Sequence, residues 1–217
     1  EAAPAGPAPR VCLPAAPERL LFCALALELA GALAAEQGSA RVEASFALSP
    51  LLPEVPGVRL GAAERSPAEL ASALDAIPAH EPALALVRPE QLGELVRRAG
   101  RTLDALLVPV DGSAAGVVRA LRLLREISPA LAGVRVFAWV VAARSAPEGA
   151  ALGERLASAA RRQHGLAVEV APALPHDPAL FRALLHGQSV HTSDDGSGAG
   201  ARELRALSRS LAARRAA

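Results

Sequence analysis

The fold is decided by the stretch "DALLVPVDGSAAGVVRALRLLREISPALAGVRVFAWVVA", residues 104–142. An apolar run at 104–110 leads into residues 113–127, whose apolar side chains recur every three or four positions, as in a helix that covers a sheet. Residues 134–142 are apolar apart from Arg135, which is typical of a parallel strand buried on both faces. The stretch therefore predicts a strand–helix–strand unit with parallel strands.

The same alternation continues along the rest of the chain. Further strands are predicted at 10–13, 40–48, 83–87 and 166–170, and further helices at 18–37, 66–77, 89–103, 146–165, 177–187 and 201–215. The pattern predicts an α/β fold: a doubly wound, mostly parallel sheet with helices on both faces. We expect one domain over residues 10–217, after a flexible lead-in at 1–9.

Ligands of such sheets bind beyond the carboxyl ends of the strands. We therefore expect a binding edge formed by the loops after residues 13, 48, 110, 142 and 170. The loop at 49–58, "SPLLPEVPGV", is predicted to be an irregular, proline-rich connection.

The composition excludes several classes of function. The 23 basic residues are all arginine and balance 22 acidic ones, so the net charge of +1 does not favour nucleic acid as the main partner. Without lysine there is no Schiff base and no phosphate-binding lysine. Cys12 and Cys23 are too few for a disulfide framework or a four-cysteine zinc site, and we expect no metal.

The most apolar segment, residues 20–35, is interrupted by Glu28 and predicts a buried core helix rather than a membrane span. The lead-in lacks the basic and apolar regions of a signal peptide, so we expect a cytoplasmic protein. Residue 1 is not methionine, which indicates a trimmed or incomplete chain.

A family resemblance is visible in the second half. The segments "LLVPVDGSAAGVVRALRLLREI", "VRVFAWVVAARSAPEG", "LPHDPALFRALLHGQSV" and "ELRALSRSLAAR" resemble the C-terminal half of the ParA/MinD family of P-loop ATPases. The likeness covers residues 104–215 and is greatest to the MinD and flagellar-placement branch. It implies a P-loop NTPase-like, Rossmann-like three-layer sandwich whose members pair or assemble with other proteins.

The chain departs from this family where nucleotide would bind. The family's phosphate loop falls on residues 14–22, "PAAPERLLF", which has no glycine and no lysine. A phosphate loop needs close backbone approach and positive charge, whereas Glu18 would repel phosphate.

Three further family positions are also changed. The Asp-x-Asp pair after the second strand is reduced to Glu43, and the adenine-binding asparagine is replaced by Ala142 or Ala143. The aspartate that binds metal through water has no clear counterpart, although Asp111 is a possible stand-in.

The resemblance and these departures together predict a catalytically inactive pseudo-ATPase. It would act as a protein-interaction or scaffold subunit in a bacterial positioning or surface-assembly system, with a protein partner or a second copy. We expect no enzyme activity, no bound ATP or ADP, no specific nucleic acid and no membrane contact.

Two alternatives stay open: a nucleotide-binding sensor without hydrolysis, and an unorthodox active ATPase. If nucleotide is bound, Asp111, Arg144 and Asp177 are the residues expected to hold it. The sensor alternative includes a likeness of "LLVPVDGSAAG" to universal stress proteins, in which the segment beginning at Asp111 would contact adenine. The same residues also suit a plain Asp-Gly turn with a serine N-cap.

Two remaining features favour structural roles. His176, His186, His191 and Asp194 lack a recurring metal-ligand spacing and are expected to be surface residues near helix ends. The final predicted helix, 201–215, has three leucines on one face and no aromatic residue, so we expect it to pack on the sheet rather than bind a membrane.

Overall fold

The computed structural model describes residues 8–16, 19–62, 64–189 and 199–213, and every strand pair within them is parallel. The strands lie in the order β3-β2-β4-β1-β5-β6-β7, and β8 also pairs with β6. They are β1 (Arg10–Pro14), β2 (Ala40–Ala44), β3 (Val58–Leu60), β4 (Ala83–Val87), β5 (Ala105–Asp111), β6 (Arg135–Ala143), β7 (Glu169–Val170) and β8 (Leu174–Pro175). The predicted fold class, a doubly wound α/β sheet, is confirmed.

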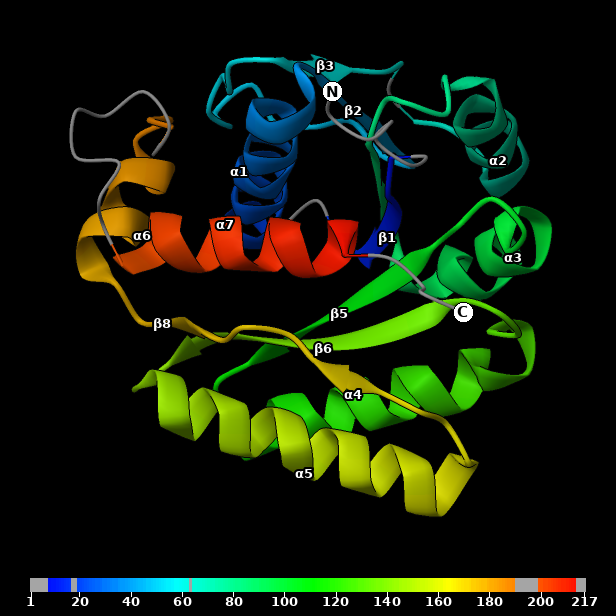
Figure 1. Ribbon diagram of the computed structural model, residues 1–217, viewed down its shortest axis with the longest axis vertical. Helices are drawn as coiled ribbons and strands as arrows, with labels where there is room; N and C mark the ends of the chain where they lie inside the picture. Colours follow the sequence, from blue (N-terminus) through cyan, green and yellow to red (C-terminus); the bar gives the residue numbers. More distant parts are fainter. Residues whose placement is uncertain (1–7, 17–18, 63, 190–198, 214–217) are drawn as a thin grey trace, which may run out of the picture.

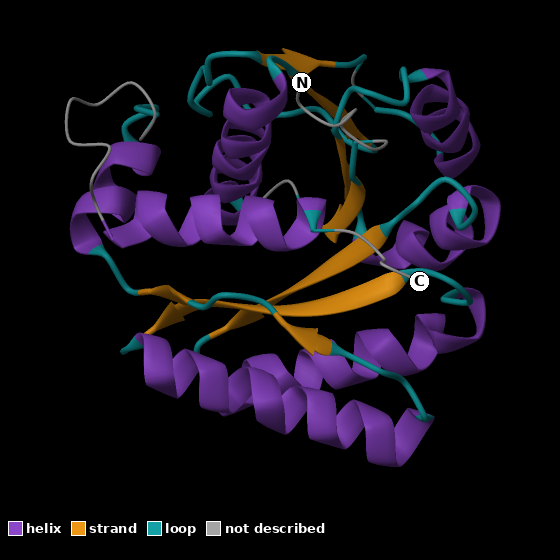
Figure 2. Ribbon diagram, viewed as in Figure 1, coloured by secondary structure: helices purple, strands orange, loops and turns teal. Residues whose placement is uncertain are grey.

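Helices cover both faces of the sheet (Figures 1 and 2). One face carries α1 (Leu20–Gln37), α6 (Pro178–Leu185) and α7 (Ala199–Ala212). The other carries α2 (Pro67–Ala76), α3 (Pro89–Ala99), α4 (Ala114–Ile127), with a 3-10 turn after it at Ser128–Ala130, and α5 (Ala146–His164).

Successive side chains along each strand point to opposite faces and so feed two separate cores. In β5, Leu107 joins the core under α1, whereas Leu106 and Val108 join the core under α3 and α4. In β6, Trp139 lies in the core under α1, and Ala138 lies in the core under α3 and α4. The continuous apolar runs of these strands reflect burial on both faces.

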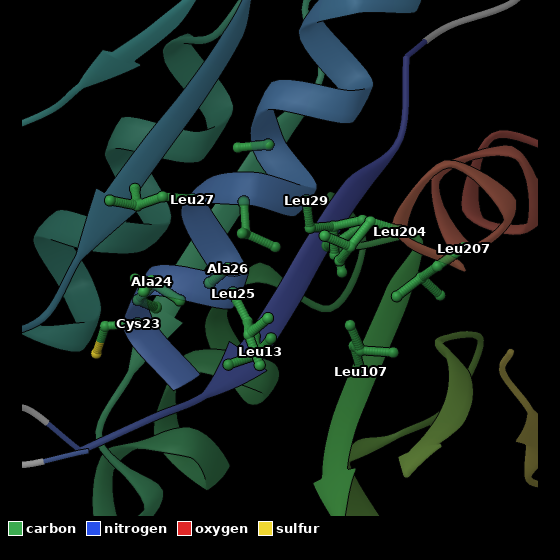
Figure 3. Close-up of a cluster of buried hydrophobic side chains, with 14 of the residues drawn as sticks. Leu13, Cys23, Ala24, Leu25, Ala26, Leu27, Leu29, Leu107, Leu204 and Leu207 are labelled. Atoms are coloured by element: carbon green, nitrogen blue, oxygen red, sulfur yellow. The ribbon is translucent and has the colours of Figure 1, made fainter. Parts of the chain in front are cut away.

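Helix α1 is buried on nearly all sides because it lies between the sheet and α7. Figure 3 shows its side chains meeting those of β1 and α7, among them Leu25, Leu13 and Leu204. Its length and hydropathy would suit a membrane span, but 67% of it is buried inside the fold, as in a core helix. Glu28, within this helix, is fully buried and accepts a hydrogen bond from Ser189 Oγ at 3.2 Å.

Helix α7 packs on α1 through its apolar stripe. Leu204, Leu207 and Leu211 are all buried in the core that also contains α1. The last helix was predicted to pack on the sheet; its described part packs mainly on α1 and also contacts β8.

The sequence did not predict β3 or β8. It predicted two other strands too long, those at 40–48 and 166–170. β3 lies at the sheet edge and includes the end of the segment predicted as a loop, and β2 ends at Ala44 rather than at residue 48. Strands of two or three residues are too short to show a hydrophobic period. At the N-terminus, Ala8 and Pro9 of the expected lead-in are buried, and Ala8 N–H donates to Ala79 O at 2.7 Å. Residues 1–7 lie outside the described range.

Candidate functional site

The carboxyl ends of the parallel strands share one side of the sheet, which we call the binding edge. Register pairs Pro14 with Val87 at the ends of β1 and β4, and Asp111 with Val141 near the ends of β5 and β6. β8 ends beside β6, where Pro175 pairs with Ala143. Loops from both halves of the chain therefore meet at this edge, as the sequence predicted.

The β1–α1 loop, where the related family would hold phosphate, uses its backbone internally. Pro14 ends β1 and has no N–H to offer. Ala15 is buried, and its N–H donates to Val87 O at 2.8 Å, extending the β1–β4 pairing. These two positions therefore present no free amide to an anion.

Helix α1 begins directly after this loop, with Arg19 as its N-cap. The Arg19 side chain makes no capping hydrogen bond, and no acidic residue lies in the first turn of the helix. The Arg19 guanidinium lies 5.8 Å from the Phe22 ring centre. The dipole of α1 adds positive character to that of Arg19. Glu18, which the sequence expected to repel phosphate, lies outside the described residues.

Arg88 is a residue of this edge that the sequence reasoning did not single out. It follows β4 directly, its N–H donates to Ser45 Oγ at 3.0 Å, and its guanidinium lies 5.6 Å from the Phe46 ring centre. The available signal was an arginine placed immediately after a fully apolar strand. Together with Arg19 it places two arginines near the carboxyl ends of β1 and β4.

Glu43 does not reach the binding edge. It lies within β2 on the α2 side, is fully buried, and pairs with Arg41 Nε at 2.8 Å and Arg65 Nε at 2.9 Å. The Arg65 N–H is not aligned for a hydrogen bond, so Glu43 Oε2 has no hydrogen-bond partner in the described part of the chain. Gly61 covers the carboxylate so closely that a Cβ there would overlap it. Glu43 is therefore buried in an ion-pair cluster beside β2 and does not take the place of the family's metal-side carboxylates.

Asp111 lies at the binding edge with its carboxylate already engaged. Oδ1 accepts a hydrogen bond from Ser113 Oγ, and Oδ2 pairs with Arg119. Ser113 Oγ in turn accepts from Gly116 N–H at 3.1 Å and caps α4. These contacts form an Asp-Gly turn with a serine N-cap. From the sequence, this turn was the alternative to an adenine contact at Asp111.

Arg144 and Asp177, the other two residues named for nucleotide, follow β6 and β8 at the same edge. Arg144 is exposed. Asp177 is the N-cap of α6, where Oδ1 accepts from Ala179 N–H at 3.0 Å and Leu180 N–H at 3.1 Å. The fold thus brings the three residues to one edge, but two of them use their carboxylates to hold helix ends.

Ala142 is conformationally strained. Its φ of 61° is in the left-handed region, which alanine rarely adopts, and it lies at the register shift between β6 and β8. Its carbonyl approaches Gly112, where any side chain would collide with it. The family's asparagine tolerates this backbone conformation better than alanine does.

A small pocket opens at the binding edge between the β1–α1 loop, the end of β5 and the first turns of α4. Its volume is about 230 Å³. Its lining is mostly apolar and includes Pro14, Phe22, Val108 and Leu123. Three charged residues line it as well: Arg19, Asp111 and Arg119.

His176 and His186, the two described histidines of the cluster seen in the sequence, have separate structural contacts. His176 packs its ring against Phe181 with centroids 5.2 Å apart, and His186 is the C-cap of α6. His191 and Asp194 lie outside the described residues. Within the described ranges, no group of three or more histidine, cysteine, aspartate or glutamate side chains could hold a metal ion.

Comparison with known proteins shows a shared fold with solved structures but no match in sequence. No family model and no curated protein sequence matches the chain. Among solved structures, a chain of the MinC:MinD cell division protein complex of Aquifex aeolicus superposes with a TM-score of 0.67 at 11% identity, covering 94% of this chain and 95% of that one. The Pyrococcus furiosus cell division ATPase MinD gives 0.63 at 10%, covering 94% and 98%. A ParA family ATPase from Chlorobium tepidum gives 0.59 at 14%, covering 95% and 98%. The chain therefore has the fold of the MinD and ParA ATPases.

Proposed function

We propose that this protein is a catalytically inactive ParA/MinD-like pseudo-ATPase. It acts as a protein-interaction or scaffold subunit in a cytoplasmic positioning or surface-assembly system of a bacterium. The observation that carries the proposal is the β1–α1 loop. Pro14 has no backbone N–H, the Ala15 N–H donates to Val87 O, and the chain has no lysine. A phosphate in this fold depends on free loop amides and a neutralising lysine.

The rest of the binding edge supports the same proposal. The Asp111 carboxylate is paired with Arg119, and that of Asp177 caps α6. To orient water or metal, Asp111 would have to loosen its contacts with Ser113 and Arg119. The structural neighbours include a MinC:MinD complex, so the fold is compatible with a role that depends on a protein partner.

The test is calorimetric titration of the purified protein with ATP and then ADP in the presence of Mg²⁺. We expect no binding heat up to millimolar nucleotide and no phosphate release. Turnover that stays with the purified protein would overturn the proposal.

Micromolar binding without turnover would instead establish the nucleotide-sensor alternative. The positive first turn of α1 and the exposed Arg144 are the features that favour this second function. In that case Arg144→Ala should weaken nucleotide binding. Arg155→Ala is the control and should leave binding unchanged, because Arg155 lies in the middle of α5, away from the loops of the binding edge.

A further inference from the structure

The pocket at the binding edge has the size of a single side chain. Pockets that hold small molecules usually measure about 300–1,000 Å³. This one measures about 230 Å³ and is floored by apolar groups of β5 and α4, including Val108 and Leu123. Burying one apolar anchor residue in such a pocket is the usual way in which a protein interface gains most of its affinity.

Among the described residues that line this pocket, arginines outnumber carboxylates. Two of its three charged lining residues are arginines, and Asp111 neutralises only Arg119. In the described part of the chain, Arg19 has an aromatic neighbour, Phe22, but no carboxylate partner. The N-terminal end of the α1 dipole, at the N-cap Arg19, lies at this mouth as well. An occupant with carboxylates next to its anchor would therefore complement this mouth.

We propose that this pocket binds an acidic segment of a protein partner, which inserts one apolar side chain between β5 and α4 and places a carboxylate against Arg19. The inference rests on the proposed non-catalytic function, because an occupied phosphate loop would crowd the same mouth. It adds the location of the contact and the chemistry of the partner.

The test starts from a random peptide display library selected on the immobilised full chain. We expect the selected peptides to share a leucine, isoleucine or phenylalanine flanked by aspartate or glutamate. Synthetic versions of these peptides are then titrated by fluorescence anisotropy, and their binding should weaken with salt, as charged contacts at an exposed mouth do.

Two variants examine the two halves of the contact. Ala120→Leu fills the pocket from α4 and should weaken peptide binding about thirtyfold, the loss expected of a central anchor. Arg19→Glu changes an exposed side chain, so it does not threaten the fold, and should weaken binding about tenfold by placing like charges together. The matched control is Arg122→Glu, which is also exposed on α4 but does not line the pocket and should bind normally.

Selected peptides without the acidic–apolar pattern, or peptides whose binding neither variant changes, would overturn this inference and leave the proposed function standing. If ATP binds by itself and displaces the peptides, both the inference and the proposed function fail. Normal binding by Arg122→Glu together with losses in the two pocket variants would support the inference.

Discussion

Replacing Gly61 by alanine should destabilise the protein strongly, and only because of Glu43. A Cβ at residue 61 would lie well inside 3.0 Å of the Glu43 carboxylate, a separation that real Cβ atoms do not reach. The carboxylate would have to leave its place between Arg41 and Arg65 while remaining buried. Breaking a buried ion pair costs about 3–5 kcal/mol. Gly61 has no positive φ, so alanine also gains about 0.4–1 kcal/mol through the unfolded state. The net loss is therefore about 2–5 kcal/mol.

The reasoning is tested by a double-mutant cycle with Glu43→Ala. That variant alone should cost about 2–3 kcal/mol, at the low end for a buried pair because Arg41 and Arg65 keep 35% and 25% of their side chains exposed to water. Once the carboxylate is gone, Gly61→Ala should change sign and stabilise by about 0.4–1 kcal/mol.

The assay is urea unfolding followed both by circular dichroism and by fluorescence of Trp139, the one tryptophan, which is fully buried in β6. Coincident transitions would justify a two-state free energy. Gly93→Ala in α3 is the matched control: its Cβ would meet Arg97 and Ile127 at ordinary distances, so it should stabilise by about 0.5–1 kcal/mol. If Gly61→Ala costs as much in the Glu43→Ala background as in the native chain, the clash is with something other than the carboxylate and the reasoning is refuted.

Three further predictions concern other parts of the fold. Ala142→Gly should raise the free energy of unfolding by about 1 kcal/mol, because it relieves the left-handed backbone at φ 61°; a lower urea midpoint would contradict this. Hydrogen bonds from the Ser66 hydroxyl and amide lower the pKa of Glu69. Its stabilising effect should therefore be present above the usual glutamate pKa of about 4.3 and be lost as the pH falls through the lower native value, a dependence that Glu69→Gln should remove from acid unfolding curves. Burial raises the pKa of the Cys12 thiol far above its usual range, so a thiol reagent should label Cys12 only as fast as the protein opens, and rapid labelling of the folded protein would be inconsistent with this.

Much of the architecture is readable in the sequence, since the covering helices carry their own signals. Helix α2 starts where the sequence shows a serine followed by proline and, three positions after the serine, glutamate; the structure has Ser66 and Glu69 in a reciprocal capping box. β4 occupies the predicted residues 83–87, and the apolar run of β6 is buried on both faces. The short edge strands β3 and β8 were missed because two or three residues carry no period.

By itself, the sequence determined the alternation of the longer strands with helices, the parallel class of the sheet, and the absence of lysine and glycine from the β1–α1 loop. These are local properties: a hydrophobic period, a cap or a missing residue type does not depend on distant parts of the chain. Only the tertiary structure decided which side chains are already engaged. Glu43 pairs with two arginines instead of reaching the binding edge, and Asp111 pairs with Arg119. Arg19 and Leu123, from distant parts of the chain, line the same pocket. These outcomes depend on how segments far apart in the chain pack, which fixes side-chain partners that no local pattern encodes.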